Sequence, residues 1–306
     1  MSAKRSPIEG PRQQAVTAKR RSSRATTGLE LYDRTAQDAA AAVIAAYSTS
    51  FALACRMLGP RVRPHVRNVY ALVRVADEIV DGPAAAAGLD ADTERRVLDE
   101  LEAETLAAIE RGFSANLVVH AFARTARECG IGANLIQPFF ASMRTDITTA
   151  DHDSASHDEY VYGSAEVVGL MCLQTFVNAG ESEPRQPAPE LVEGARRLGA
   201  AFQDVNFLRD LDHDAGALGR DYLGASSRPE VLARIDADLA CAAAVIPRLP
   251  KDCRRAVTAA HDLFAELAVR LRRDARQTSR VRVPDPVKAV LAARAWMGFS
   301  PRSARA

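Results

Sequence analysis

The chain has 306 residues and is close to electrical neutrality, with 40 basic and 39 acidic side chains. This balance argues against the strongly basic surface of a nucleic-acid-binding protein, and we expect no nucleic-acid partner. Hydrophobic residues make up 47% and aromatic residues 6% of the sequence, and alanine is abundant, which favours a helical protein with a substantial core. The five cysteines are far apart and show no metal-binding spacing, as is typical of a reduced, cytosolic protein.

Residues 1–28 are rich in Ser, Gln, Arg and Lys and poor in large apolar side chains, so the sequence predicts a disordered basic tail. A solubilising role or a wrongly assigned start is the simpler interpretation, and weak attraction to anionic lipid or a transit peptide are the functional ones. No apolar segment follows the basic residues, so we expect no secretory signal. No stretch is long and apolar enough to predict a membrane span.

From residue 31 onward, one helical pattern follows another, with Gly and Pro between them. Gly59-Pro60 and Gly82-Pro83 are typical of helix ends. No segment has the two-residue period of a strand, and no internal repeat is present. We therefore predict a single all-α domain over residues 29–297 and a C-terminal tail over 298–306. The expected helices are 33–58, 62–82, 92–112, 115–129, 132–148, 157–180, 188–215, 228–247, 252–276 and 285–297.

The helix expected at 62–82 carries charged residues within an otherwise apolar segment. Arg74, Asp77 and Asp81 share a face, because they are three, four and seven residues apart. Charged side chains on so apolar a helix are costly to bury unless they are paired or bind a metal. A solvated face is the alternative, but it would show polar residues at the flanking positions.

The helix expected at 188–215 carries a second polar column, Asn206, Asp210 and Asp214, about 12 Å long at roughly 1.5 Å per residue. Taken alone, this column is equally compatible with a solvated face and with a metal site. Two acidic helices together predict one shared site for Mg²⁺, with Mn²⁺ as an alternative, because Mg²⁺ is usually held by one or two carboxylates and substrate phosphates. We find no phosphate-binding loop and no dinucleotide fingerprint, which suits a diphosphate that enters as its metal complex.

Four stretches, in order, resemble the squalene/phytoene synthases, which join two prenyl diphosphates head to head. The resemblance covers about residues 33–295 and is closest to bacterial carotenoid-pathway members. A single D-x-x-x-D pattern is weak evidence, whereas four motifs in the same order are strong. The stretches are Ser48-Thr-Ser-Phe51 with Leu58-Gly-Pro, Tyr70 to Asp81, Tyr160 to Leu170, and Ala195 to Leu223.

The resemblance implies an isoprenoid-synthase fold, a single helical domain around a central hydrophobic cavity. It also implies metal ligands on both acidic helices, residues that contact diphosphate or stabilise a carbocation, and residues that shape a tunnel for prenyl chains. The implied metal ligands are Asp77, Asp81, Asn206, Asp210 and Asp214, the implied catalytic residues are Tyr70, Arg74, Tyr160, Gln203 and Arg209, and the implied substrate-binding residues are Ser50, Phe51, Val168, Gly169, Arg220 and Tyr222.

Other polar and small residues near these motifs have simpler interpretations. Asp204, Asp212 and His213 point to other faces of the second acidic helix, and we expect all six histidines to be structural or solvated. Gly163 and Gly169 are compatible both with close approach of a prenyl chain and with tight helix packing. Three positions depart from the family pattern: Tyr47 stands where several members carry His, Asp204 replaces an apolar residue, and Phe264 replaces an aromatic hydroxyl.

The implied activity is a prenyltransferase that condenses two geranylgeranyl diphosphates to phytoene through a cyclopropylcarbinyl diphosphate, without NADPH. The alternatives are a squalene or dehydrosqualene synthase that uses farnesyl diphosphate, and a non-catalytic relative that acts as an assembly protein. The retained acidic residues argue against the assembly protein. Because the product is very apolar, we expect a cytoplasmic protein in peripheral contact with the membrane, although the sequence locates no contact surface and predicts no oligomeric state.

Overall fold

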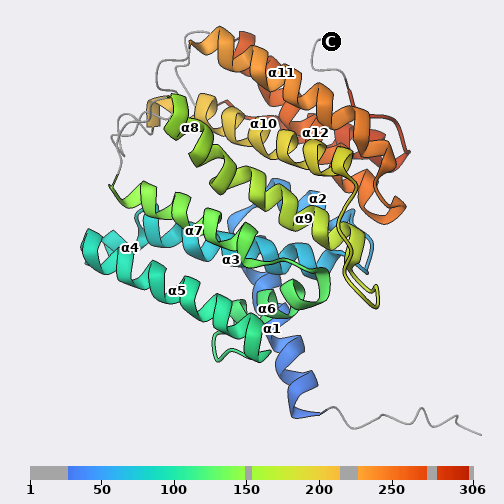
Figure 1. The fold of residues 1–306 in the computed structure, drawn as a ribbon. Helices are drawn as coiled ribbons and strands as arrows, with labels where there is room; N and C mark the ends of the chain where they lie inside the picture. Colours follow the sequence, from blue (N-terminus) through green and yellow to red (C-terminus); the bar gives the residue numbers. More distant parts are fainter. Residues whose placement is uncertain (1–26, 149–153, 214–226, 274–280, 303–306) are drawn as a thin grey trace, which may run out of the picture.

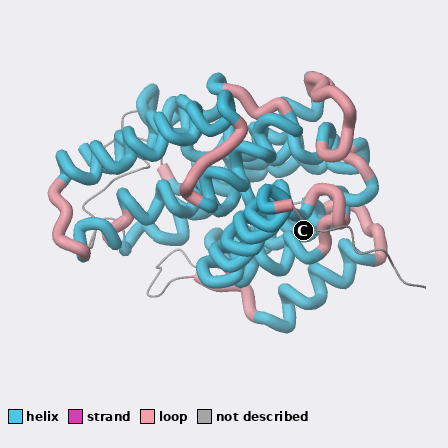
Figure 2. Tube along the Cα trace, turned by 90° about the horizontal axis from the view of Figure 1, so that it is seen from below, coloured by secondary structure: helices cyan, strands magenta, loops and turns pink. Residues whose placement is uncertain are grey.

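The computed structural model describes residues 27–148, 154–213, 227–273 and 281–302. Within these ranges the chain forms helices and loops without a strand, which confirms the expected all-α class (Figure 1, Figure 2). The predicted basic tail falls almost entirely outside the described residues, and so do Asp214, Arg220 and Tyr222. The side chain of Ser50 is not described either, although its backbone belongs to a helix.

The described helices follow one another in chain order, with a π-helical turn η1 (Tyr162–Glu166) between the eighth and ninth and a 3-10 turn (Ile246–Arg248) after the eleventh. They are α1 (Gly28–Tyr47), α2 (Thr49–Arg56), α3 (Arg63–Val80), α4 (Pro83–Ala86), α5 (Ala91–Arg111), α6 (Leu117–Cys129), α7 (Ala133–Thr148), α8 (Ser154–Val161), α9 (Val167–Asn178), α10 (Pro189–His213), α11 (Arg228–Val245), α12 (Lys251–Arg273) and α13 (Asp285–Trp296).

Local sequence determines several helix ends. At the start of α1, the Thr27 hydroxyl accepts a hydrogen bond from the Glu30 amide (3.1 Å), and the Glu30 carboxylate accepts one from the Thr27 amide (2.9 Å). Ser227 and Glu230 form the same capping box at the start of α11. At the end of α3, Gly82 has φ +112°, a conformation that favours glycine, and Pro83 then starts the short helix α4.

One helix was expected over 33–58, and this prediction is wrong because the chain breaks at Ser48. Ser48 has an extended backbone (φ −145°, ψ 112°), and its hydroxyl accepts a hydrogen bond from the Phe51 amide at 3.1 Å. Ser48 therefore ends α1 and caps α2. The break gives α2 a direction of its own, and α2 contributes Phe51 to the site described below.

One continuous α-helix was expected over 157–180, and the structure instead inserts η1 between α8 and α9. A π-helical turn adds a residue to a helical turn and is frequent at functional sites. Gly163 of η1 packs against α7, where a Cβ atom would overlap the Pro138 carbonyl and the Ser142 hydroxyl. This contact supports the packing interpretation of Gly163.

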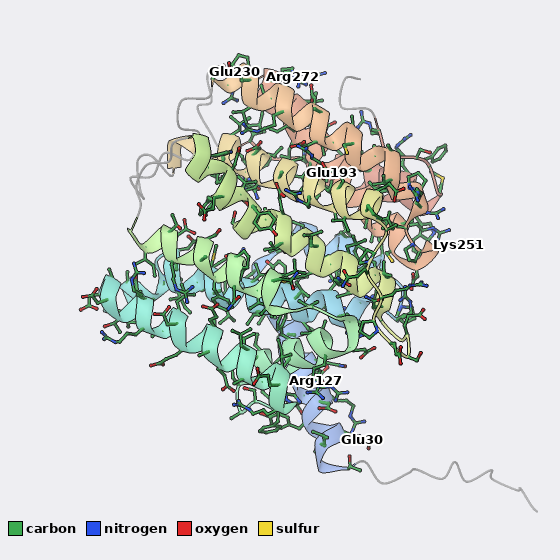
Figure 3. All side chains as sticks on the ribbon, in the orientation of Figure 1. Glu30, Arg127, Glu193, Glu230, Lys251 and Arg272 are labelled. Carbon is green, nitrogen blue, oxygen red and sulfur yellow. The ribbon has the colours of Figure 1, made fainter. Side chains whose placement is uncertain are left out.

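Two large buried hydrophobic clusters form most of the core, and a small third cluster of alanines joins α1, α3 and α6. One large cluster joins α3, α5, α6, α7 and α9 with the start of α12, and the other joins α10, α11 and the rest of α12 with the end of α8. Figure 1 shows α3, α5, α6 and α7 below α10, α11 and α12, with α9 between these two layers. Charged side chains labelled in Figure 3, such as Glu230, Lys251 and Arg272, lie on the outside of these layers.

Candidate active site

A central cavity of about 670 Å³ lies between the two hydrophobic clusters and takes lining residues from both. Its volume is within the range of roughly 300–1,000 Å³ that is typical of small-molecule sites. The N-terminal halves of α3 and α10 line it with apolar residues such as Val66, Val69 and Leu198, and their C-terminal halves with polar residues. Because both C-terminal ends lie on the same side in Figure 1, the cavity has a polar end and an apolar end.

Helix α3 lines the cavity with Tyr70, Arg74, Asp77 and Asp81, whose spacing of three to four residues keeps them on one face. The Arg74 guanidinium lies 3.7 Å from the Asp77 carboxylate and 3.3 Å from that of Glu78. Asp81 is the C-cap of α3, and its amide donates to the Asp77 carbonyl at 2.8 Å. The predicted first acidic face is therefore present and is directed into the cavity.

The carboxylate of Asp77 lies in an environment that disfavours its charge. Burial raises its pKa to about 8; Arg74 acts in the opposite direction, while Asp81 and Asp146 raise the pKa further. A cation bound beside these oxygens would favour the ionised form. The polar end of the cavity thus carries more carboxylate charge than the neighbouring arginine neutralises.

Helix α10 lines the opposite wall with Gln203, Asn206, Arg209 and Asp210. The Arg209 side chain donates to Asp210 from Nε, at 3.0 and 3.2 Å to the two carboxylate oxygens, and from Nη2 at 2.5 Å. Arginine therefore accompanies aspartate on both walls. Asp214, the third member of the predicted column, lies outside the described residues.

Tyr160 is held against α7 at both ends of the residue. Its hydroxyl donates to Asp146 at 2.9 Å, and its backbone carbonyl accepts from the Ser142 hydroxyl at 3.2 Å. Ser142 and Asp146 are four residues apart on α7, so they present both groups on one face. Asp146 also lines the cavity. Sequence reasoning missed both residues, and the only available signal was their i, i+4 spacing.

Aromatic rings line one side of the cavity. The Phe51 ring lies 6.2 Å from Tyr70 and 6.4 Å from Phe202, and Phe202 stacks on Phe264 with centroids 3.7 Å apart. The Tyr70 hydroxyl is buried, and it has no hydrogen-bond partner of normal geometry among the described residues. Phe202 was not predicted, because its role depends on how α10 and α12 pack together.

Glycines bring α10 into backbone contact with η1 and α9. A Cβ atom on Gly199 would lie 2.6 Å from the Ala165 carbonyl oxygen, and one on Gly169 would lie 2.6 Å from that of Ala195. Both glycines line the cavity next to Val168. Tight packing therefore explains Gly169, while its predicted place in the tunnel wall is also retained.

Asp204 is directed away from the cavity lining. It is 1% exposed and accepts hydrogen bonds from Arg234 at 2.7 and 3.1 Å, with the His157 ring 3.5 Å away. Asp204 stands where the family pattern has an apolar residue. The charge of its buried carboxylate is thus compensated by an arginine of α11. The described histidines are part of such structural contacts and do not line the cavity. The side chains of Asp212 and His213 are not described.

The cavity wall brings together the described members of the predicted set. These are Phe51, Tyr70, Arg74, Asp77, Asp81, Tyr160, Val168, Gly169, Gln203, Asn206, Arg209 and Asp210. They come from α2 and α3 and, after α4 to α7 have intervened, from α8, α9 and α10. Their individual roles stay predictions.

A family model described as squalene/phytoene synthase matches residues 44–228. The chain belongs to this family. Its members are prenyltransferases, so the prediction of a prenyltransferase is confirmed at the level of the family. The matched range includes both acidic helices and η1.

Individual relatives agree with this assignment. The chain is 27% identical over 259 residues to the 15-cis-phytoene synthase of Paracoccus sp. (strain N81106 / MBIC 01143), an alignment that covers 77% of this chain and 82% of the relative. It is 32% identical over 181 residues to phytoene synthase 3, chloroplastic, of Zea mays, covering 58% of this chain and 40% of the plant protein. The chain thus spans less than half of that longer relative.

The fold is also that of a solved relative. A crystal structure of a dehydrosqualene synthase in complex with ligand has a TM-score of 0.71 to this chain at 22% sequence identity, and it covers 87% of this chain and 97% of its own. This similarity confirms the expected isoprenoid-synthase fold.

Proposed function

We propose that this protein catalyses the Mg²⁺-dependent head-to-head condensation of two geranylgeranyl diphosphates to phytoene. The observation that carries the proposal is that α3 and α10 direct carboxylate and guanidinium groups into the same end of one cavity, whose remaining wall is apolar. The polar end suits two diphosphates, and the apolar end suits two prenyl chains. The phytoene synthase relatives support the choice of the C20 substrate.

The donors at the polar end fit Mg²⁺, with Mn²⁺ as an alternative. In the described part of the chain, no group of three or more His, Cys, Asp or Glu is placed to hold a metal ion unaided. Mg²⁺ is usually bound by one or two carboxylates together with substrate phosphates. We assign Asp77 and Asp81 on one wall, and Asn206, Asp210 and Asp214 on the other. When bound, the ion supplies Lewis-acid stabilisation of the charge on a leaving diphosphate.

The reaction begins at the polar end. The C–O bond of the first substrate breaks, the diphosphate leaves with the electron pair, and the double bond of the second substrate attacks the allylic cation. Loss of a proton gives a cyclopropylcarbinyl diphosphate, and a second ionisation, rearrangement and proton loss give phytoene. No reductant is needed, so we propose that NADPH takes no part.

The protein's own residues bind diphosphate and stabilise positive charge. Arg74 and Arg209 bind diphosphate oxygens, because guanidinium matches their geometry, and we assign Arg220 the same role. The faces of Tyr70 and Phe51 and the dipoles of Tyr160 and Gln203 stabilise the carbocations. The apolar wall excludes water, which would otherwise capture these cations.

We place the protein in the cytoplasm, in peripheral contact with the membrane that receives its apolar product. None of the described helices is long and apolar enough to cross a bilayer.

Product analysis tests the proposal. Purified protein with Mg²⁺ is given C15 and C20 diphosphates separately, with and without NADPH, and the extracted hydrocarbons are identified. We expect phytoene from the C20 substrate without NADPH, and no turnover once a chelator removes Mg²⁺. A C30 product from the C15 substrate, with no turnover of C20, would instead identify a squalene or dehydrosqualene synthase. No turnover of either substrate would favour the assembly protein.

A further inference from the structure

The outer face of α13 is apolar, which is unusual for a helix at a protein surface. After Asp285 at its start, every exposed residue of this helix and of its C-cap is apolar. Val290, Trp296 and Met297 are 60%, 58% and 65% exposed, and Phe299 beyond them is 52% exposed. Large apolar side chains gathered on one surface mark a contact site. This outer face consists of Pro286, Ala289, Val290, Ala293, Trp296, Met297 and Phe299.

The fold holds this outer face in a defined position. The Arg302 amide donates to the buried Asp262 carboxylate of α12 at 2.8 Å, and the Arg302 guanidinium lies 3.3 Å from Glu266. These contacts fasten the segment after α13 to α12. Phe299 is therefore part of a folded surface. The Arg294 guanidinium lies over the Phe299 ring, 5.1 Å from the ring centroid.

Two arginines lie against aromatic rings of the outer face. The Arg255 guanidinium of α12 lies 5.0 Å from the Trp296 ring centroid. Residues 281–302 contain one acidic residue, Asp285, against four basic ones, which are Arg282, Lys288, Arg294 and Arg302. An apolar helix face with Trp and Phe, flanked by Lys and Arg, is the composition of a surface that lies on anionic lipid. Basic residues close to such a membrane add electrostatic attraction.

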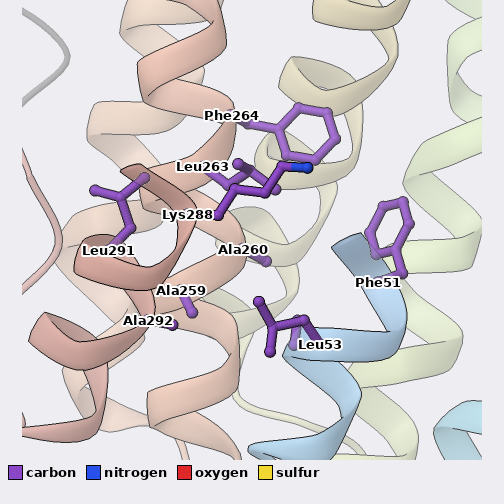
Figure 4. A pocket seen from close by; sticks show the side chains of 10 residues that line it. Phe51, Leu53, Ala259, Ala260, Leu263, Phe264, Lys288, Leu291 and Ala292 are labelled. Carbon is purple, nitrogen blue, oxygen red and sulfur yellow. The ribbon is translucent and has the colours of Figure 1, made fainter. Parts of the chain in front are cut away.

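A small crevice on the inner side of α13 shares lining residues with the central cavity. It lies between α2, α12 and α13, has a volume of about 30 Å³, and is apolar apart from Lys288 (Figure 4). Phe51, Ala54 and Ala260 line both the crevice and the cavity. Docking through α13 would therefore place the membrane beside an apolar boundary of the active-site cavity.

We propose that the outer face of α13, with Phe299, docks onto the surface of an anionic lipid bilayer. The apolar side chains enter the interface, and Arg255 and Arg294, which lie against Trp296 and Phe299, contact lipid headgroups. The proposal depends on this surface and its charges and is tested without substrate, so its outcome and that of the proposed reaction are independent.

Trp296 makes the test direct, because it is the only tryptophan of the chain. The full-length protein is mixed with vesicles of phosphatidylcholine alone or with phosphatidylglycerol, and tryptophan fluorescence is recorded. We expect a blue shift with the anionic vesicles, quenching by brominated lipid, and weaker binding at high salt, because salt screens the electrostatic part. Vesicle binding without quenching of Trp296 would overturn the proposal and indicate another surface, such as the basic N-terminal tail.

Matched variants complete the test. Val290→Ser combined with Met297→Ser keeps the fluorescent reporter, and it should weaken vesicle binding by roughly tenfold or more, because two large apolar side chains leave the interface. Leu29→Ser combined with Leu31→Ser removes apolar side chains of similar exposure, 57% and 58%, from α1 and should leave binding unchanged. Equal effects of the two double variants would overturn the proposal. A blue shift that needs no vesicles and follows dimer formation in light scattering would assign the face to a second copy of this chain.

Discussion

Asp77 and Asp210 approach the same cavity from different helices, and each stands beside an arginine. Replacing either by Ala should reduce turnover by roughly 100-fold or more, since charge stabilisation at a reacting centre is of this size. Steady-state kinetics and a thermal melt of each variant measure the effect. Glu78→Gln is the matched control, because Glu78 is on α3 beside Asp77 but is not part of the cavity lining, and it should lose less than about tenfold. Substantial activity in Asp77→Ala or Asp210→Ala would refute the metal–diphosphate assignment.

The hydrogen bond from Tyr160 to Asp146 fixes the direction of the tyrosine hydroxyl in the cavity wall. Asp146→Ala removes the acceptor and should lower kcat by up to about 100-fold, because small displacements of reacting groups are costly. Asp146→Asn keeps an acceptor oxygen and should retain most of the activity. The two variants are compared by kcat and KM separately. Equal losses in both would show that the charge of Asp146 matters rather than its hydrogen bond to Tyr160.

Asp238 of α11 should make the stability of the protein depend on pH. Burial raises its pKa to about 6, although Arg197 acts in the opposite direction. Because this value lies above the ordinary 3.8, the contribution of Asp238 to stability is complete below about pH 4 and is lost as the pH rises to about 6.

Asp238→Asn removes this titration. The variant's unfolding free energy minus that of the wild type should increase by up to about 3 kcal/mol between pH 4 and pH 7. Loss of the Arg197 contact lowers this difference by the same amount at both pH values. Urea unfolding at both pH values measures the difference. The same difference at both pH values would contradict the expectation.

At the scale of elements, the contact of α10 with η1 leaves no room for a side chain. Gly199→Ala would place Cβ against the Ala165 backbone, which cannot rotate away, so the helices must separate. We expect a loss of about 1–3 kcal/mol in the free energy of unfolding, together with reduced activity as the cavity wall shifts. Gly28→Ala is the control, because no atom lies within 4 Å of its Cβ position, and it should be neutral or slightly stabilising. Equal stability of the two variants in urea unfolding would show that the helices tolerate separation.

The sequence was sufficient for most elements and for the two acidic helices. Helical periodicity, with Gly82-Pro83 as punctuation, predicts α3, and the i, i+4 spacing places Asp77 and Asp81 on one face. These properties are local, so they can be read from a few consecutive residues. The two acidic helices together already predicted one shared site, and the structure directs both into one cavity.

Other features depend on contacts between distant segments. The turn η1 accompanies the packing of Gly163 against α7, and Asp146 gains its role only because α7 lies beside Tyr160. The break at Ser48 could have been anticipated, since Ser is a favoured N-cap, but the same residue is also tolerated within a helix. Phe202 and the outer face of α13 likewise emerge only when helices are assembled.

At the scale of the whole molecule, the cavity makes stability depend on its occupant. A non-reactive C20 diphosphate analogue with Mg²⁺ should stabilise the protein by about 2.7 kcal/mol at a concentration 100 times its Kd. This corresponds to a rise of several degrees in Tm for a domain of this size. Differential scanning calorimetry measures the shift, with inorganic diphosphate and Mg²⁺ at the same concentration as the control. Equal shifts for both ligands would mean that the apolar wall contributes no binding energy.

The position of the cavity between two hydrophobic clusters has a thermodynamic consequence. Two prenyl chains would cover apolar surface on both clusters at once, so that binding removes the kind of surface that folding removes. Binding of the C20 analogue should therefore carry a large negative change in heat capacity, and its enthalpy should vary steeply with temperature. In this sense the hydrophobic core of the protein is completed by its substrates, and association resembles a last stage of folding.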